Sequence, residues 1–275
     1  MTNTEMLALI QKVEIDAIKE FKKICDEHDI DFFLRGGSVL GAVKYGGFIP
    51  WDDDMDVAVP REGYDKLPVI FQDRIIAGKY QVLCYQYCEG LHCYFPRLFL
   101  LEDERKRIGL PRNTNLGLHL VDIIPLDGAP DNYLLRKLYF CKVFLYRFLA
   151  SLGTTYIGDH IDMHSIQQKI IIALFKKLGF AKLFPQNSIY TRLDRLYKRY
   201  DWKKQNYAGT VSASLFSKEV MPREIWGQGV ELPFEDTQFK VPTDFDSYLK
   251  RLYGQNYRYE EPSDDKKKSH LKGVS

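Results

Sequence analysis

Apolar residues recur every three or four positions between Met6 and Ile24, and charged residues fill most of the positions between them. Because this period is that of the α-helix, the stretch predicts an amphipathic helix, which we expect to end near His28. The apolar run 31–35 that follows is short enough for a strand. The chain is therefore expected to begin with a long helix and a short apolar strand.

The next segment starts with a glycine pair, Gly36-Gly37, which is typical of a break in regular structure. Ser38 follows it and predicts an N-cap that opens a short helix running to Tyr45. Backbone N–H groups at a helix start bind anions, phosphate in particular. A Gly-Gly-Ser stretch alone is most often only a turn, so its meaning depends on its neighbours.

Those neighbours are acidic. Residues 54–59 alternate as a strand does, so Asp54 and Asp56 point to the same face. Asp122 lies in the apolar stretch 118–124, which also predicts a strand. Clustered carboxylates repel one another unless a hard cation lies between them, and oxygen ligands suit magnesium or manganese. A metal beside a phosphate-binding helix start indicates phosphoryl chemistry.

Plainer interpretations exist for each of these residues. An acidic run such as Asp52-Asp53 is usually a solvated loop, although the apolar flanks 48–51 and 57–59 predict that Asp54 and Asp56 lie at a buried strand edge. Asp122, taken alone, equally fits a core aspartate whose side chain is satisfied by hydrogen bonds.

The cysteines and histidines offer a different metal, zinc. Cys84, Cys88, His92 and Cys93 lie close in sequence, but they lack a paired C-x-x-C spacing and fall in a strand-like segment. The five cysteines of the chain are therefore expected to be free thiols in a reducing compartment. We interpret His92 and His119 as packing or hydrogen-bonding residues.

The 275 residues are enough for one large domain with a substantial core. Residues 130–205 are helical in pattern and carry 14 basic and 5 acidic residues, a net charge of +9, whereas the rest of the chain carries −7. We expect one domain over 1–275, with 130–205 as a basic helical insertion. Further elements are expected as strands at 80–84 and 93–101, a hairpin at 230–241 with its turn at 233–236, a helix at 244–253 and a polar tail at 260–275.

Two apolar stretches of the insertion, 133–149 and 166–184, interleave lysine and arginine with leucine, isoleucine and phenylalanine. They fit core helices with basic outer faces, or a surface pair that rests on anionic lipid headgroups. The basic residues concerned are Arg136, Lys137, Lys142, Arg147, Lys169, Lys176, Lys177 and Lys182. Nucleic acid is not expected as a partner, because the rest of the chain is negative.

The sequence shows no leader-like start and no apolar segment long enough to span a bilayer, so we expect a cytoplasmic protein. The segment "LRGGSVLGAVKYGGFIPWDDDMDVAVPREGY" resembles the signature of the LicD family. "GLHLVDIIPLDG" and "FKVPTDFDSYLKRLYGQNY" resemble two further blocks of that family. The resemblance implies an α+β fold, with a mixed sheet core of nucleotidyltransferase type flanked by helices.

The resemblance also implies an activity: magnesium-dependent transfer of a phosphorylated small alcohol, most familiarly phosphocholine from CDP-choline, to a cell-surface glycan. A lipid-linked glycan or teichoic-acid precursor as acceptor would bring the protein to the inner membrane face. The loop after residue 93 is longer and more charged than the family pattern, which leaves the choice of acceptor open.

The family's functional residues carry over to matching positions. Asp54 and Asp56 would bind the metal, and Asp52 would join them directly or through water. Asp122 would complete the metal shell or act as the base for the acceptor hydroxyl. The remaining implied residues are Gly36, Gly37 and Ser38 as the phosphate turn, and Lys44, Arg61 and Arg97 as groups that hold the donor phosphates.

Three functions from different classes are compatible with the sequence. The first is transfer of a phosphoalcohol from a CDP-linked donor. The second is nucleotidyl transfer from a nucleoside triphosphate on the same fold. The third is a non-catalytic glycan-binding protein, against which the self-repelling carboxylates argue, because a site without catalysis has no need to keep them.

Overall fold

The computed structural model describes residues 2–88, 90–153 and 185–259. Its strands are β1 (Phe33–Leu34), β2 (Met55–Pro60), β3 (Ile75–Ile76), β4 (Tyr80–Leu83), β5 (Arg97–Leu100), β6 (Leu118–Ala129), β7 (Tyr207–Gly209), β8 (Met221–Pro222), β9 (Val230–Phe234) and β10 (Thr237–Val241). Its helices are α1 (Asn3–Glu27), α2 (Gly36–Tyr45), α3 (Arg61–Tyr64), α4 (Leu67–Phe71), α5 (Glu102–Ile108), α6 (Tyr133–Gly153), α9 (Gln186–Tyr197), the 3₁₀-helix η2 (Phe216–Glu219), α10 (Arg223–Trp226) and α11 (Phe245–Tyr253).

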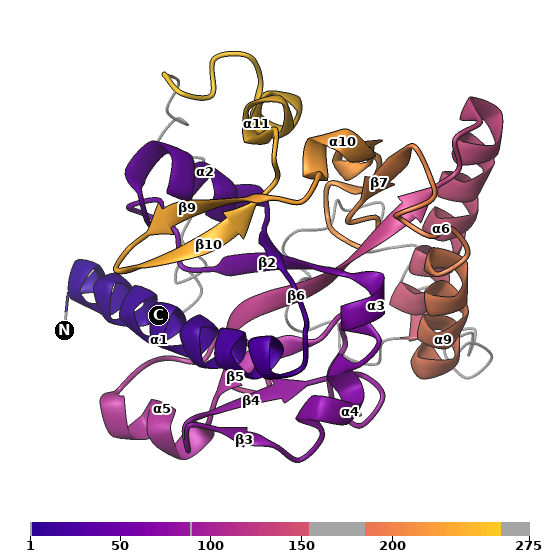
Figure 1. Cartoon of the computed structure of the whole chain (residues 1–275). Coiled ribbons are helices and arrows are strands. Elements are labelled where there is room, and N and C mark those ends of the chain that lie inside the picture. The colour runs from indigo at the N-terminus through magenta and orange to yellow at the C-terminus, as the bar shows by residue number, and fades with distance from the viewer. Residues whose placement is uncertain (1, 89, 154–184, 260–275) are drawn as a thin grey trace, which may run out of the picture.

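The strands form a mixed sheet in the order β1-β2-β6-β5-β4-β3, and β7 and β8 extend it from the far half of β6 (Figure 1). β2 and β6 run parallel at its centre, whereas the other paired strands of the described chain are antiparallel. The expected α+β class, with a mixed sheet flanked by helices, is confirmed. β6 is longer than predicted, because its second half pairs with β7.

Helix α1 confirms the prediction from periodicity and covers one side of the sheet. Thr2 and Glu5 form a capping box at its start, and His28 is its C-cap. On its inner face Phe21 is fully buried and stacks on Phe71 of α4, with ring centroids 5.2 Å apart. Burying one such aromatic side chain contributes about 1.5–3 kcal/mol, so α1 is a main element of the core.

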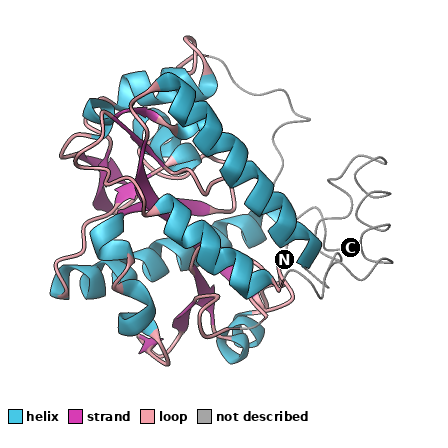
Figure 2. Ribbon diagram, turned by 90° about the vertical axis from the view of Figure 1, so that its right-hand side faces the viewer, coloured by secondary structure: helices cyan, strands magenta, loops and turns pink. Residues whose placement is uncertain are grey.

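Helices α6 and α9 pack side by side at one end of the sheet, and both face the viewer in Figure 2. A second group of buried residues joins them, including Tyr139 and Val143 of α6 and Leu193 of α9. The predicted stretch 166–184, with Lys169, Lys176, Lys177 and Lys182, lies outside the described residues, as does the tail 260–275. Within the residues that are described, no helix combines the length and apolar character needed to cross a bilayer.

The predicted hairpin is formed by β9 and β10, with a tighter turn than expected. Phe234 pairs with Thr237, so only Glu235 and Asp236 make the turn, and Glu235 has a positive φ of 55°. The backbone N–H of Glu235 donates to the carbonyl of Gly46, and its carboxylate accepts from the N–H of Phe48. The hairpin thereby holds the loop that leads into the acidic segment.

Candidate active site

The parallel pair at the centre of the sheet brings together carboxylates that are far apart in sequence. Asp56 on β2 and Asp122 on β6 are register partners, and Arg97 on β5 is the register partner of Asp122 on its other side. Asp54 directly precedes β2, which begins one residue later than predicted. Two of the four predicted acidic residues, Asp56 and Asp122, therefore meet in the sheet, and Asp54 lies two positions before Asp56.

Asp56 lies at the centre of this group. Its side chain is 23% exposed, and its Oδ2 accepts a hydrogen bond of 2.6 Å from Arg35. Burial raises the pKa of Asp56 to about 8, an effect that the Arg35 guanidinium opposes. The charges of Asp122 and Asp54 raise this pKa further. The carboxylates thus repel one another despite the arginine, and additional positive charge would stabilise their ionised forms.

Arg35 connects Asp56 to a carboxylate from the far end of the chain. Its guanidinium, only 5% exposed, lies 2.5 Å from Oε2 of the fully buried Glu219. Thr210 donates a hydrogen bond to the same oxygen. Because a buried charge is tolerated only when paired, Glu219 fixes Arg35 and, through it, the orientation of Asp56. The sequence analysis missed this network, since nothing in the sequence connects Arg35 with a residue 184 positions later.

Arg97 stands beside Asp122. Its Nε lies 2.8 Å from Oδ1 of Asp122, and its guanidinium packs over the ring of Phe95 at 5.6 Å. His119 Nε2 lies 3.5 Å from the same Asp122 oxygen. His119, which we interpreted as a packing or hydrogen-bonding residue, therefore lies next to this carboxylate.

The glycine turn is the first turn of α2, which corrects one prediction. Gly36 begins the helix with φ 54°, a conformation that suits glycine, and Arg35 rather than Ser38 is the N-cap. Ser38 lies inside the helix, and its hydroxyl accepts from the N–H of Asp56 at 3.0 Å. This bond ties the helix start to β2, a role that the capping preference of serine does not reveal.

The N–H groups of this turn differ in whether they already donate a hydrogen bond within the protein. That of Gly36 donates to the Tyr248 hydroxyl at 2.8 Å, and that of Ser38 to the Arg35 carbonyl at 3.1 Å. The N–H of Gly37 has no partner in the described part of the chain. Of the three predicted phosphate-binding residues, Gly37 thus has the N–H group best placed to bind an anion.

The acidic loop before β2 is held from the side of α1 as well. Gln11 donates from its side chain to the carbonyl of Asp52 at 2.9 Å. A Cβ atom built on Gly37 would lie 3.1 Å from Oδ2 of Asp52, so this carboxylate lies against the start of α2. Asp52 is therefore close to the helix start, where the partial positive charge of the N-terminus favours it.

Glu14 of α1 is a further carboxylate that the sequence analysis missed. It is fully buried, and neither of its oxygens has a hydrogen-bond partner in the described chain. Burial raises its pKa well above the ordinary value, and the charges of the acidic loop, Asp54 first, raise it further. Its contribution to stability is therefore full at pH values below its unfolded pKa, and is lost as the pH rises through the folded pKa.

We expect Glu14→Met to raise the free energy of unfolding at pH 8 by about 1–3 kcal/mol, because an apolar side chain of similar length removes a buried, unpaired acid. It should also flatten the decline in stability between pH 5.5 and pH 8. Urea denaturation at both pH values measures this. The matched control is Glu20→Met, a partly exposed position of the same helix that pairs with Lys23; it should leave the pH dependence as in the parent protein.

Two predicted phosphate-binding residues lie elsewhere. Arg61 follows the opposite end of β2, and its guanidinium binds both oxygens of the buried Asp127 at 2.7 and 2.6 Å and one of Asp194 at 3.0 Å. Lys44 lies in the last turn of α2, away from the helix start, with its ammonium 5.4 Å from the ring of Tyr45. Arg61 is thus paired with Asp127 and Asp194 instead of with Asp56 or Asp122.

The predicted ligands of a magnesium or manganese ion are Asp52, Asp54, Asp56 and Asp122. In the described part of the chain, no three acidic, histidine or cysteine side chains stand together as a ligand set. Asp56 and Asp122 are paired with Arg35 and Arg97. The carboxylate donors and the repulsion around Asp56 fit a hard divalent cation, whose binding would compete with these ion pairs.

The cysteine-rich segment forms a separate region. All five thiols of the chain are free, and burial raises the pKa of Cys84 to about 12. The Nδ1 atom of His92 is 2.9 Å from Oε1 of Gln186 in α9, so this histidine makes the hydrogen bond expected of it.

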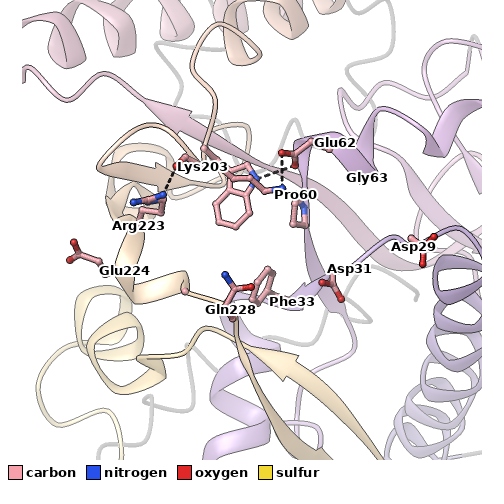
Figure 3. A pocket seen from close by; sticks show the side chains of 12 residues that line it. Asp29, Asp31, Phe33, Pro60, Glu62, Gly63, Lys203, Arg223, Glu224 and Gln228 are labelled. Carbon is pink, nitrogen blue, oxygen red and sulfur yellow. Dashed lines mark hydrogen bonds and ion pairs between the residues drawn. The ribbon is translucent and has the colours of Figure 1, made fainter.

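A cavity of about 640 Å³ opens beside Pro60 (Figure 3). Its lining includes the rings of Phe33 and Trp202, and the indole N–H of Trp202 donates to Glu62 at 3.1 Å. The predicted carboxylates do not line it. Pro60 lies four residues from Asp56, about 13 Å along an extended strand, so this cavity is distinct from the carboxylate site.

The structure thus has an α+β architecture, with a mixed sheet whose central parallel pair brings two carboxylates next to a helix start. The family described as LicD/FKTN/FKRP, nucleotidyltransferase domain, matches residues 29–94, which hold α2, the acidic loop and β2. The lipopolysaccharide cholinephosphotransferase LicD of Haemophilus influenzae is 26% identical over 268 residues, 95% of this chain and 94% of that protein. Residues 29–94 thus match the LicD family, and the likeness to one protein of that name extends over nearly the whole chain.

Shorter matches cover parts of two other proteins. An uncharacterized protein of Rickettsia typhi is 29% identical over 77 residues, 26% of this chain and 25% of that protein. An uncharacterized protein of Rickettsia prowazekii is 33% identical over 45 residues, 16% of this chain and 17% of that protein.

Proposed function

We propose that this protein transfers a phosphorylated small alcohol, phosphocholine in the first instance, from a CDP-linked donor to a hydroxyl group of a cell-surface glycan precursor. The observation that carries the proposal is the pairing of Asp56 with Asp122 on adjacent parallel strands, next to the start of α2. Support comes from the relative named a lipopolysaccharide cholinephosphotransferase, which is similar over nearly the whole chain.

The proposal includes a divalent cation, magnesium or manganese. Asp54 and Asp56 would hold it, with Asp52 and Asp122 as further ligands. When bound, such a cation neutralises the phosphate oxygens of the donor and the charge that develops on them. The N–H of Gly37, at the start of α2, and the guanidinium of Arg97, next to Asp122, would supply positive charge from the chain itself.

In the proposed reaction the acceptor hydroxyl oxygen forms a bond to the phosphorus atom that carries the alcohol. The bond from that phosphorus to the oxygen bridging it to the cytidylate breaks, and CMP leaves with the bonding electrons. The hydroxyl proton passes to a carboxylate. Asp122 is our candidate for this base, because Arg97 and His119 hold its side chain on the same sheet as Asp56.

The acceptor is proposed to be a lipopolysaccharide or teichoic-acid precursor linked to lipid at the inner membrane face. This location would place a cytoplasmic enzyme, and the CDP-linked donor it uses, on the same side of the membrane as the acceptor. Nucleotidyl transfer from a nucleoside triphosphate is the alternative reaction, since it needs the same carboxylates and the same helix start.

The nucleotide released distinguishes these two reactions. Purified protein is incubated with magnesium and with CDP-choline, other CDP-alcohols or nucleoside triphosphates, in the presence of acceptor glycan. We expect CMP to be released from a CDP-alcohol. Release of pyrophosphate from a triphosphate, with CDP-alcohols left intact, would establish the nucleotidyl reaction instead. Glycan binding without any nucleotide release would indicate a non-catalytic protein.

A further inference from the structure

A groove between α6 and α9 gathers positive charge without any carboxylate in its lining. It encloses about 240 Å³ and is lined by Lys142, Tyr146, Arg192, Arg195, Leu196 and Arg199. The lysine and the tyrosine are one turn apart on α6, Arg192 and Arg195 are three residues apart on α9, and Arg199 lies two residues after the end of that helix. The two helices and the residues just after α9 thus contribute four basic side chains to one small hollow.

The single acidic residue of α9 lies away from this groove. Asp194 accepts a hydrogen bond from Tyr94 at 2.6 Å and pairs with Arg61 at 3.0 Å and with Lys198 at 2.8 Å. The helix therefore directs its carboxylate to the core network and its arginines to the groove. In the described part of the chain, no carboxylate in the groove lining therefore neutralises its basic side chains.

The basic groups of the groove also differ from other basic residues of the insertion. Arg136 donates to the carbonyl of Pro130, and Arg147 donates to that of Ala213, so both serve the fold. Within the described residues, the charged groups of Lys142, Arg192 and Arg195 make no ion pair or hydrogen bond. Like charges held this close repel one another, and a bound anion relieves the repulsion.

We propose that this groove binds a phosphate group, that of an anionic lipid headgroup. Arginine forks match phosphate oxygens, and the hollow is smaller than the range of about 300–1,000 Å³ typical of sites for larger ligands. The lipid source is indicated by the neighbouring surface of α6. Leu138 and Leu145, four residues before and three after Lys142, share its helix face and are 66% and 54% exposed.

Under the proposed function, this site would hold the protein on the membrane that carries its acceptor. Vesicle co-sedimentation of the full chain at low salt tests it, with phosphatidylcholine vesicles that contain or lack phosphatidylglycerol. The variant is Arg192→Gln/Arg199→Gln, which changes two exposed residues. The control Arg107→Gln/Arg258→Gln removes the same charge from exposed positions outside the groove.

We expect binding that depends on phosphatidylglycerol and is about thirtyfold weaker in the groove variant, the equivalent of about 1 kcal/mol for each of two basic residues. The control should bind within about threefold of the parent protein, because its arginines lie outside the contact. Equal weakening in both variants, or no binding by the parent protein, would overturn the lipid site.

Calorimetric titration with inorganic pyrophosphate separates the two sources of phosphate. Binding of pyrophosphate to the parent protein, with no vesicle binding, would assign the groove to a soluble phosphate compound and overturn the lipid source. Neither experiment contains a CDP-linked donor or an acceptor glycan. A negative result in either one therefore leaves the result on CMP release unaffected. Failure of CMP release likewise leaves the vesicle result standing.

Discussion

Asp56→Asn is expected to lower kcat/KM for phosphocholine transfer at least about a thousandfold while the protein remains folded. The amide keeps the shape of the side chain but removes the charge that would bind the cation. Arg35 retains its partner Glu219, so no buried charge is left alone. Without magnesium, the free energy of unfolding should stay the same or increase, because repulsion with Asp54 and Asp122 is removed.

Steady-state kinetics and urea denaturation, each with and without magnesium, measure these effects. The matched control is Asp103→Asn, the same chemical change at an exposed position of α5, which should leave both quantities unchanged. If Asp56→Asn kept roughly a tenth or more of the parent activity, the assignment of this carboxylate to the reaction would be wrong.

The largest expected effect on stability comes from Arg61→Met, a loss of about 3–5 kcal/mol in the free energy of unfolding. Arg61 binds both oxygens of Asp127, which is 1% exposed, and also contacts Asp194 of α9. Removal of the guanidinium leaves a buried carboxylate without its partner. Because Asp194 belongs to the helical insertion, the same change should loosen the attachment of α9 to the core.

Two further variants make this result interpretable. Arg74→Met removes an arginine from an exposed pair with Glu27 and should cost less than about 1 kcal/mol. Arg61→Met/Asp127→Asn removes the stranded charge as well and should recover part of the loss. Urea denaturation of the four proteins is the measurement. A small effect of Arg61→Met on the free energy of unfolding would contradict a structural role for this residue and would favour its predicted role in phosphate binding.

Local periodicity predicted the elements around the site well. The apolar spacing of α1, the alternation of β2 and the boundaries of α11 follow from residues close in sequence. Asp244, for example, caps α11 by accepting from the N–H of Ser247, as its position before the helix suggests. The convergence of Asp56 and Asp122 was also expected, since two carboxylates in apolar strands require a shared counter-charge.

Pairings across long sequence separations were not predictable in the same way. Serine is a common N-cap residue, yet the Ser38 hydroxyl accepts a hydrogen bond from the backbone of β2, because the helix already begins at Gly36. Arg61 has the charge expected of a phosphate ligand, but only the tertiary structure, which brings Asp127 of β6 and Asp194 of α9 to its guanidinium, reveals its acidic partners. In these cases the residue type fixes the chemistry of the side chain, and the tertiary structure selects its partner.

Doubly labelled CDP-choline distinguishes transfer of the alcohol phosphate from transfer of the nucleotide at the carboxylate site. The donor carries ³H in the cytidine and ¹⁴C in the choline, and is incubated with the protein, magnesium and acceptor glycan. We expect ¹⁴C to enter the glycan, ³H to remain in solution as CMP, and Asp56→Asn to transfer neither label. Incorporation of ³H into the glycan, or transfer of ¹⁴C by Asp56→Asn at the parent rate, would contradict this expectation.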